Sequence, residues 1–245
     1  MIIGSNILLF ETLPSTNTHA AGLLKNNKLP EGSIIHTHYQ TAGRGYYGNS
    51  WESEYGKNLL ISIILYPSFM NASDQFQISM AISLGICDFL TSIIPECSIK
   101  WPNDIYVNND KIAGILIENS ISGDRIENTI AGIGLNINQE KFSDAPNPVS
   151  LRKLTGKSFD LNTCLNQLSA NLDKRYKQLM AGSPDEINRE YNSKLYRLNQ
   201  WFKFRDSKGI RTGRILSTGE YGRLKIESQD GERNEYNFKE IEFIP

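Results

Sequence analysis

The sequence predicts an α/β protein, of the α+β kind, in which a mixed β-sheet with helices packed on one face precedes a small C-terminal β-barrel. Apolar residues recur at helical spacing between Gln75 and Ile94, branched apolar runs such as residues 58–66 have strand length, and short strands alternate with turns near the C-terminus. A chain of 245 residues can form one large domain with a small appendage. We place the domains at residues 1–198 and 199–245.

The elements expected before residue 140 are strands and helices joined by turn-rich segments. Ser15 is the expected cap of the first helix, and Pro102 ends a short strand. Two hairpins are expected, with turns at Asn108-Asn109-Asp110 and Gly123-Asp124. The expected strands are residues 6–12, 33–39, 58–66, 97–101, 105–107, 111–120 and 125–138, and the expected helices are residues 19–25 and 75–94.

The rest of the chain divides into a helical part and a strand-rich part. Helices are expected at residues 161–180 and 184–195. Turn signals at residues 207–209, 217–220 and 230–231 then divide the C-terminal segment into short strands, as in a small barrel. This change of pattern sets the domain boundary near Leu198.

Charge and cysteine content indicate a cytoplasmic protein with no general affinity for polyanions. Twenty-six Lys and Arg side chains oppose twenty-seven Asp and Glu, so any anion site must be local and nucleic acid is not an expected partner. Three cysteines without metal-ligand spacing are typical of reduced thiols and do not indicate a zinc site. No apolar run reaches the length of a membrane span, and the N-terminus lacks the basic start of a signal peptide.

Residues 43–51, Gly-Arg-Gly-Tyr-Tyr-Gly-Asn-Ser-Trp, form a glycine-rich loop around Arg44. The loop matches the dinucleotide-binding spacing, but the segment after it leads into a strand where that motif requires a helix. It also lacks the lysine of a phosphate-binding P-loop. We therefore interpret it as a loop that wraps a small anionic ligand, with Arg44 as a forked donor. Taken alone, it also fits a surface turn with a solvated arginine.

Two further segments favour a ligand site. Strict alternation along residues 111–116 places Lys111 on one face with Ala113 and Ile115, where it would begin an apolar floor. Alternation also places Gly132, Gly134 and Asn136 on one face of a strand. The missing side chains of the glycines leave room for a ring, and the amide of Asn136 can form hydrogen bonds with the edge of that ring. A solvated lysine and tight strand packing are the plainer alternatives.

Together these segments resemble the biotin protein ligases. The resemblance extends from about Leu8 to the C-terminus, and its motifs occur in the family's order. They are Ser15-Thr16-Asn17, Gln40 before the Gly-Arg-Gly loop, Lys100-Trp101-Pro102-Asn103-Asp104, Lys111-Ile112-Ala113-Gly114, and Gly132-Ile133-Gly134-Leu135-Asn136. The resemblance implies a class II synthetase-like catalytic domain followed by an SH3-like barrel.

The resemblance also implies a two-step reaction. Biotin's carboxylate attacks the α-phosphorus of ATP to give biotinyl-AMP, and a lysine of a biotin carboxyl carrier domain, from acetyl-CoA carboxylase or a related biotin enzyme, then displaces AMP. Arg44, Lys111 and Mg²⁺ would offset the negative charge that develops at phosphorus. It further implies a sheet that can pair with the carrier or with a second copy of the chain.

Residue roles follow from the matching motif positions. Arg44 and Lys111 are the implied catalytic residues. The implied biotin-binding residues are Ser15, Thr16, Gln40, Gly43, Arg44, Lys111, Gly114, Gly132 and Gly134. The implied ATP- and adenylate-binding residues are Gly45, Tyr46, Trp51, Asn103, Ile115 and Asn136, and Asp104 is the implied magnesium ligand. Trp101 is expected in the core.

The sequence departs from the family pattern in two respects. Tyr46 and Asn49 occupy positions where the family commonly has arginine, so we expect Tyr46 to close the loop by stacking and hydrogen bonding. Only fourteen residues precede Ser15, too few for the winged-helix domain of bifunctional relatives, so we expect no repressor role.

Three other interpretations fit parts of the sequence. A lipoate or octanoate ligase or transferase of the same fold would also use Lys111. A non-catalytic biotin-binding protein would have the pocket without the chemistry. A generic α/β domain with an SH3-like interaction module would leave the coincident motifs unexplained.

Overall fold

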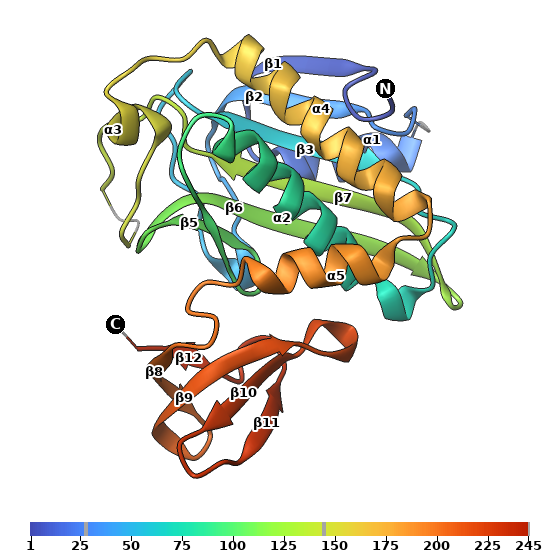
Figure 1. The fold of residues 1–245 in the computed structure, drawn as a ribbon. Coiled ribbons are helices and arrows are strands. Elements are labelled where there is room, and N and C mark those ends of the chain that lie inside the picture. Colours follow the sequence, from blue (N-terminus) through green and yellow to red (C-terminus); the bar gives the residue numbers. More distant parts are fainter. Residues whose placement is uncertain (27–28, 144–145, 245) are drawn as a thin grey trace.

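The computed structural model describes residues 1–26, 29–143 and 146–244, which form two β-sheets with helices around the larger one (Figure 1). The larger sheet has seven strands in the order β1-β2-β3-β7-β6-β5-β4. Only β1 and β2 pair in parallel, and the other neighbours are antiparallel. Its strands are β1 Ile7–Leu13, β2 Ile34–Gln40, β3 Leu59–Leu65, β4 Ser98–Lys100, β5 Asp104–Val107, β6 Asp110–Ser122 and β7 Arg125–Leu135. The predicted α/β fold class is confirmed.

The long helices α2 (Phe76–Thr91) and α4 (Leu161–Met180) cover one face of this sheet, with α5 (Pro184–Ser193) beside them (Figure 1). The apolar stripe of α2 is buried, as its spacing predicts. Gly85 lets α2 approach α4 closely, because a Cβ there would lie 2.8 Å from Leu172 Cδ2.

The opposite face has a smaller core under α1 (Thr16–Asn26). Ile35 and Ile64 belong to this core, whereas the preceding residues Ile34 and Ile63 belong to the main core. Neighbouring strand residues point to opposite faces, so α1 covers the face that α2 and α4 leave open. This places the N-terminus of α1 beside the middle of the sheet.

The second sheet has five strands in the order β11-β10-β9-β8-β12. They are β8 Trp201–Asp206, β9 Gly209–Thr218, β10 Leu224–Ser228, β11 Arg233–Tyr236 and β12 Glu242–Phe243. Every pairing in this sheet is antiparallel. Its first strand begins three residues after Leu198, and the division into domains at that point stays a prediction.

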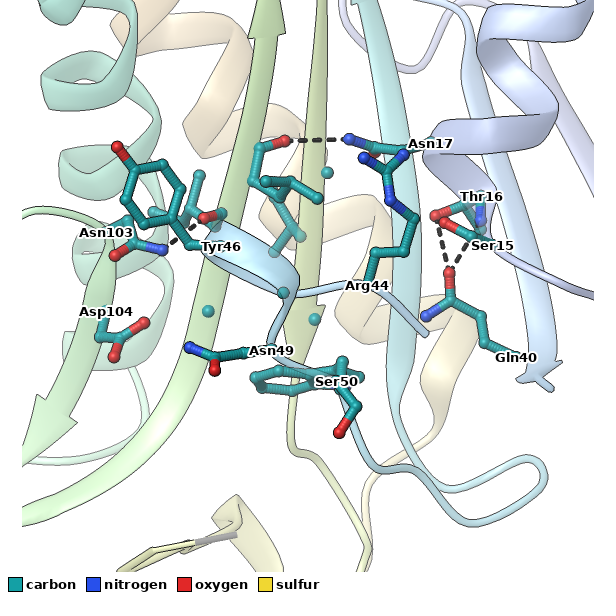
Figure 2. Close-up of a pocket in the computed structure, with 18 of the residues that line it drawn as sticks. Ser15, Thr16, Asn17, Gln40, Arg44, Tyr46, Asn49, Ser50, Asn103 and Asp104 are labelled. Carbon is teal, nitrogen blue, oxygen red and sulfur yellow. Dashed lines mark hydrogen bonds between the residues drawn. The ribbon is translucent and has the colours of Figure 1, made fainter. Parts of the chain in front are cut away.

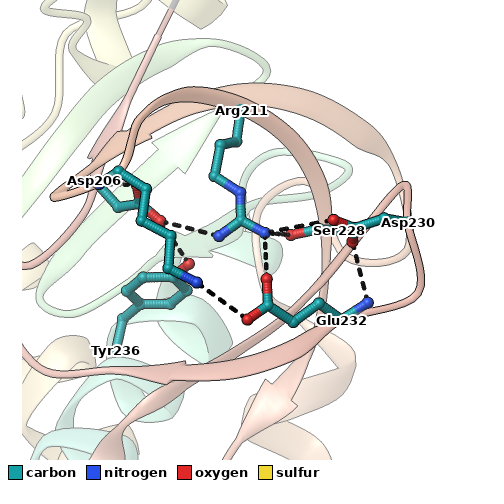
Figure 3. A network of polar contacts seen from close by, with 7 residues as sticks. Asp206, Arg211, Ser228, Asp230, Glu232 and Tyr236 are labelled. Atoms are coloured by element: carbon teal, nitrogen blue, oxygen red, sulfur yellow. Dashed lines mark hydrogen bonds and ion pairs between the residues drawn. The ribbon is translucent and has the colours of Figure 1, made fainter.

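Polar contacts around Arg211 hold the small sheet together (Figure 3). The Arg211 guanidinium donates to Ser228 Oγ at 2.8 Å and Glu232 Oε2 at 2.6 Å, and Tyr236 donates its hydroxyl to Asp206 at 2.8 Å. Hydrogen bonds from Lys208 and Arg211 lower the pKa of Glu232 to about 2. A small apolar core gains order from such a network when its members are satisfied.

The two sheets meet at Trp101, which is buried as expected. Its Nε1 donates to the Gly222 carbonyl at 2.8 Å, and its ring centroid lies 5.2 Å from that of Phe238. Phe238 also lies 5.8 Å from Phe76. Residues around the smaller sheet therefore contact α2 and the Lys100–Asp104 segment of the larger sheet.

The element prediction missed α3 (Leu151–Thr155), which Ser150 caps through its side chain and Gly156 ends at φ 71°. The helix has only one apolar turn, too short for a periodic signal. Within the described ranges, no helix has the length and apolarity to cross a membrane.

Candidate functional site

A cavity of about 140 Å³ lies between the N-terminus of α1, the glycine loop and the centre of β6 and β7 (Figure 2). Of the sixteen predicted site residues, all line it except Gly43 and Asn136. The full lining is Ser15, Thr16, Asn17, Gln40, Arg44, Gly45, Tyr46, Asn49, Ser50, Trp51, Asn103, Asp104, Lys111, Gly114, Ile115, Leu116, Gly132, Ile133 and Gly134. The fold thus brings segments a hundred residues apart into one pocket, while the roles of these residues stay predictions.

Two predicted residues lie just outside this lining. Gly43 shapes the loop itself, because its carbonyl accepts the Trp51 N–H at 2.9 Å and a Cβ on it would lie 2.5 Å from Trp51 O. Asn136 lines an adjoining cavity of about 420 Å³ that shares Trp51 and Lys111 with the first. Its buried Oδ1 accepts no hydrogen bond from any described residue, although its Nδ2 donates to Val149 O. An exposed amino edge, such as that of adenine, fits this acceptor.

The floor of the pocket is a pair of glycines facing each other across β6 and β7. Gly114 pairs with Gly134, and the Trp51 indole lies directly on both, since Cβ atoms there would fall 2.8 and 2.3 Å from its ring. At Gly132 a Cβ would lie 2.3 Å from Asn17 Oδ1. The sequence analysis expected these glycines to make room for the ring of a ligand, whereas in this structure the ring that lies on Gly114 and Gly134 is the chain's own Trp51.

The sequence analysis placed the Lys111 side chain on the wrong face of β6, because β6 contains a bulge. Ile105 pairs with Ala113 but Tyr106 pairs with Lys111, so Ile112 is an extra residue in the ladder. A bulge shifts the alternation by one position. Lys111 consequently shares a face with Gly114, whose Cβ position lies 3.4 Å from Lys111 Cε. Its ammonium group is directed into the pocket and does not begin an apolar floor.

Lys111 forms an ion pair with Asp104, with Nζ 2.7 Å from Oδ1. Both side chains are largely buried, at 28% and 21% exposure. The Lys111 ammonium also lies 5.6 Å above the Trp51 ring. Nearby, burial lowers the pKa of Lys100, which donates to the Tyr106 hydroxyl at 3.0 Å. Burial also raises the pKa of Tyr106 to about 12.

The fit of a magnesium ion depends on Asp104. Among the described residues, no cluster of three metal ligands occurs, and Asp104 is the single carboxylate in the lining of the first cavity. Magnesium in nucleotide sites usually takes one or two carboxylates, with phosphate oxygens and waters completing the shell. Asp104 suits that mode as a single carboxylate ligand that is held in place by Lys111.

Arg44 is held by an acidic residue that the motif analysis did not identify. Its Nη2 lies 2.8 Å from Glu118 Oε1, and its Nη1 lies 3.4 Å from both Glu118 Oε2 and Thr18 Oγ1. The arginine side chain points toward Asn17 in Figure 2, and Asn17 Nδ2 donates to Glu118 at 2.8 Å. Period-two counting from Gly114 through Leu116 reaches Glu118 and could have found it.

Asn17 belongs to the Ser15-Thr16-Asn17 motif, and it is among the most buried polar residues of the site, although the resemblance implies no role for it. Its Oδ1 accepts from Ser62 Oγ at 2.6 Å, and its Nδ2 also donates to Leu116 O at 3.1 Å. Gln40 plays a similar part beside it, where its Oε1 accepts from the Thr16 amide at 2.8 Å and the Thr16 hydroxyl at 3.1 Å. Amide groups that are held in place in this way can form hydrogen bonds with the edge of a planar polar ring.

Tyr46 extends the pocket toward the C-terminal module. It begins a single 3-10 turn, residues Tyr46–Gly48, and lies on the side of Asn103 in Figure 2. Its ring meets that of Phe238 edge-on at 5.9 Å. Asn103 in turn donates its Nδ2 to Ile115 O at 2.8 Å. The loop thus contacts Phe238, near the smaller sheet, as well as the larger sheet.

The fold and the site together define an α/β protein with a pocket over its central hairpin, β6 and β7. The pocket has a floor of glycines, a buried polar end at Thr16 and Gln40, and a glycine-rich loop above it. Two cationic side chains, Arg44 and Lys111, lie in it, each paired with a carboxylate. The sequence pattern of the biotin/lipoate A/B protein ligase family matches residues 9–136. The chain belongs to that family.

Individual relatives agree with this assignment. A bifunctional ligase/repressor BirA from Bacillus spizizenii is 29% identical over 235 residues, which cover 94% of this chain and 72% of the relative. A biotin–[acetyl-CoA-carboxylase] ligase from Paracoccus denitrificans is 32% identical over 163 residues, covering 63% of this chain and 66% of the relative. The solved structure of a biotin protein ligase from Aquifex aeolicus in complex with biotin and ATP superimposes with a TM-score of 0.80 at 27% identity, covering 98% and 99% of the two chains.

Proposed function

We propose that this protein is an ATP-dependent biotin ligase that forms biotinyl-AMP and transfers the biotinyl group to a lysine of a biotin carboxyl carrier domain. The observation that carries the proposal is the convergence of Arg44, Lys111 and the glycine floor on one cavity. The relatives support it, since those from Paracoccus and Aquifex are named for this reaction or its substrates.

The proposed roles follow the geometry of the site. Thr16, Gln40 and Asn17 would bind biotin's ureido ring at the buried polar end. Asn103, Ile115 and Asn136 would surround adenine, with the free Oδ1 of Asn136 as an acceptor. Arg44 and Lys111 would meet the carboxylate and the α-phosphate between these ends, where negative charge accumulates. When bound, Mg²⁺ supplies further charge neutralisation at the phosphates, and we propose Asp104 as its protein ligand.

The proposed setting is the cytoplasm, and the proposed partner is a carrier domain of acetyl-CoA carboxylase or a related enzyme. The thiols Cys87, Cys97 and Cys164 are unpaired and buried, which fits a reducing compartment. We propose no nucleic-acid partner, and we propose that the exposed edge of β1 pairs with a carrier or with a second copy.

Biotin-dependent exchange of labelled pyrophosphate into ATP tests the first step. We expect exchange with biotin and not with octanoate or lipoate, followed by labelling of a purified carrier domain. Exchange driven by octanoate would favour the lipoate-type alternative. Biotin binding without any exchange would favour a non-catalytic binding protein and overturn the proposal.

Tyr46→Arg should reduce the escape of biotinyl-AMP from the enzyme several-fold. In this chain Tyr46 contacts Phe238 through its ring and adds no positive charge to the loop, whereas arginine would attract the anionic adenylate. Diffuse biotinylation of a bystander protein, detected by avidin blot, measures the escape. Tyr46→Phe is the matched control, because it keeps the ring without adding charge. Equal bystander labelling by wild type and Tyr46→Arg would show that loop charge does not retain the intermediate.

A further inference from the structure

Two of the three cysteines lie side by side in the main core. Cys87 lies near the C-terminal end of α2, and Cys97 directly precedes β4. The Cys97 thiol donates to the Cys87 carbonyl oxygen, 4.0 Å from its Sγ, and the two thiols also hydrogen-bond to each other. Cys87 is fully buried, whereas Cys97 is 9% exposed. The fold thus holds two thiols in contact, with Cys97 on the more accessible side.

The surroundings of the pair make the two thiols unequal. The hydrogen bond from the Cys87 thiol, together with the nearby Lys194 ammonium, lowers the pKa of Cys97 despite its burial. The same hydrogen bond and burial raise the pKa of Cys87. The charge of Asp88 opposes a thiolate here, but Arg175 Nε binds its carboxylate at 2.6 Å. Cys97 is therefore the thiol with thiolate character, and Cys87 is its protonated neighbour.

The end of α5 completes the surroundings of the pair. Lys194 caps α5, and its carbonyl oxygen accepts from the Ile99 N–H on β4 at 2.8 Å, which fixes the lysine backbone beside the strand. Tyr191 is fully buried, and burial followed by the charge of Cys87 raises the pKa of its hydroxyl. Among the described residues, that hydroxyl has no hydrogen-bond partner. A buried donor of this kind can bind an oxygen atom added to a neighbouring sulfur.

We propose that Cys87 and Cys97 form a peroxide-reactive dithiol that closes reversibly into an intramolecular disulfide. Thiols that react with peroxides are ionised and accessible, and they often lie beside a second thiol that traps the oxidised form. Cys97 is the most exposed of the three cysteines, and Cys87 is the second thiol. The inference goes beyond the proposed ligase reaction and needs neither biotin nor ATP. It places a redox modification at the start of the strand that leads into the Lys100–Asp104 segment.

The oxidation proceeds in two balanced steps. The Cys97 thiolate attacks one oxygen of hydrogen peroxide, an S–O bond forms as the O–O bond breaks, and hydroxide leaves, so the sulfur is oxidised and the peroxide is reduced. The Cys87 sulfur then attacks the Cys97 sulfur, an S–S bond forms, and the S–O bond breaks. The hydroxyl group leaves as water with the Cys87 proton. A dithiol reductant reverses the process by thiol–disulfide exchange.

The third cysteine, Cys164 on α4, is a comparison within the same chain. Its side chain is 3% exposed, and burial raises the pKa of its thiol to about 11. The nucleophile in these reactions is the thiolate, so a thiol that stays protonated reacts slowly. We therefore expect Cys164 to remain reduced under conditions that oxidise Cys87 and Cys97.

Thiol counting on the folded protein tests the pair directly. After treatment with hydrogen peroxide and then denaturation, the free thiols per chain should fall from three to one, and dithiothreitol should restore all three. Cleavage after Glu96 separates the peptides of Cys87 and Cys97, so mass spectrometry should find these peptides joined through sulfur. A count that stays at three, or a disulfide that includes Cys164 or a second chain, would overturn the proposal.

Alanine variants separate the attacking thiol from the resolving thiol, with circular dichroism as the check on folding. Cys97→Ala should lose thiols to peroxide at least tenfold more slowly than wild type. Cys87→Ala should accumulate a sulfenic acid at Cys97, which dimedone traps. Cys164→Ala should form the disulfide at the wild-type rate. Wild-type oxidation of Cys97→Ala, or no trapped sulfenic acid in Cys87→Ala, would contradict the assigned roles. If a variant does not fold, the peptide map of the wild type still decides whether the pair forms.

Discussion

Lys111→Met should lower the rate of biotin-dependent pyrophosphate exchange roughly 100- to 1000-fold, because removing one preorganised donor from a charge-stabilising site typically costs about 3 kcal/mol. The lysine ammonium is directed into the pocket by the bulge at Ile112 and is fixed by Asp104 at 2.7 Å. Adding Arg44→Gln should bring exchange to background. Steady-state exchange with saturating ATP measures both effects.

Loss of Lys111 also leaves Asp104 without its partner, so a second variant is needed. Lys111→Met combined with Asp104→Asn restores the charge balance and should recover any melting temperature that the single variant loses, while exchange stays at or below the single variant's rate, because Asp104 is also the proposed magnesium ligand. Lys203→Met, which removes an exposed lysine of β8, should exchange normally. If Lys111→Met with Arg44→Gln formed biotinyl-AMP at the wild-type rate, the assigned roles of both cations would be wrong.

Gly134→Val should raise the biotin concentration for half-maximal exchange roughly 10- to 100-fold, which corresponds to the 1–3 kcal/mol that overpacking typically costs. The new Cβ would lie 2.3 Å from the Trp51 ring, so the indole must leave the glycine floor or the strands must separate. Valine is well tolerated in strands, so the fold should persist. Thermal melting measures the effect on the stability of the fold, and titration with biotin measures the effect on biotin affinity.

Two observations separate a binding effect from a folding effect. Gly22→Ala on α1 meets no atom within 4 Å and should leave biotin affinity unchanged. In Gly134→Val the tryptophan emission should change in the absence of biotin, because Trp51 is one of three tryptophans and loses its position. Unchanged biotin affinity in a folded Gly134→Val protein would show that the floor is not part of the binding surface.

The large sheet was predictable because its elements carry strong local signals. The continuous apolar run of β3 and the helical spacing of α2 each specify one structure. The helix at Leu161–Met180 was predicted with its observed bounds. By contrast, the one-turn helix after Ser150 has no period to detect, and the two-residue strand Glu242–Phe243 forms only because β8 lies beside it.

The candidate site could be predicted where its residues form a contiguous motif. It could not be predicted where the side of the sheet on which a side chain lies depends on pairing with another strand. The glycine loop and the Lys100–Asp104 segment could be read directly from the sequence. The facing of Lys111 could not, because the bulge at Ile112 arises from pairing with β5, which single-strand alternation ignores. Glu118 belongs to no recognised motif, and its part became visible only when folding placed it 2.8 Å from Arg44.

The pairing of both cations with carboxylates has a consequence for how substrates arrive. Arg44 with Glu118 and Lys111 with Asp104 form two neutral doublets, so an approaching acid meets little net field at the entrance. Its capture should therefore depend only weakly on ionic strength. The site then distinguishes one acid from another inside the pocket, where an oxygen of the substrate must replace Glu118 on Arg44 or Asp104 on Lys111.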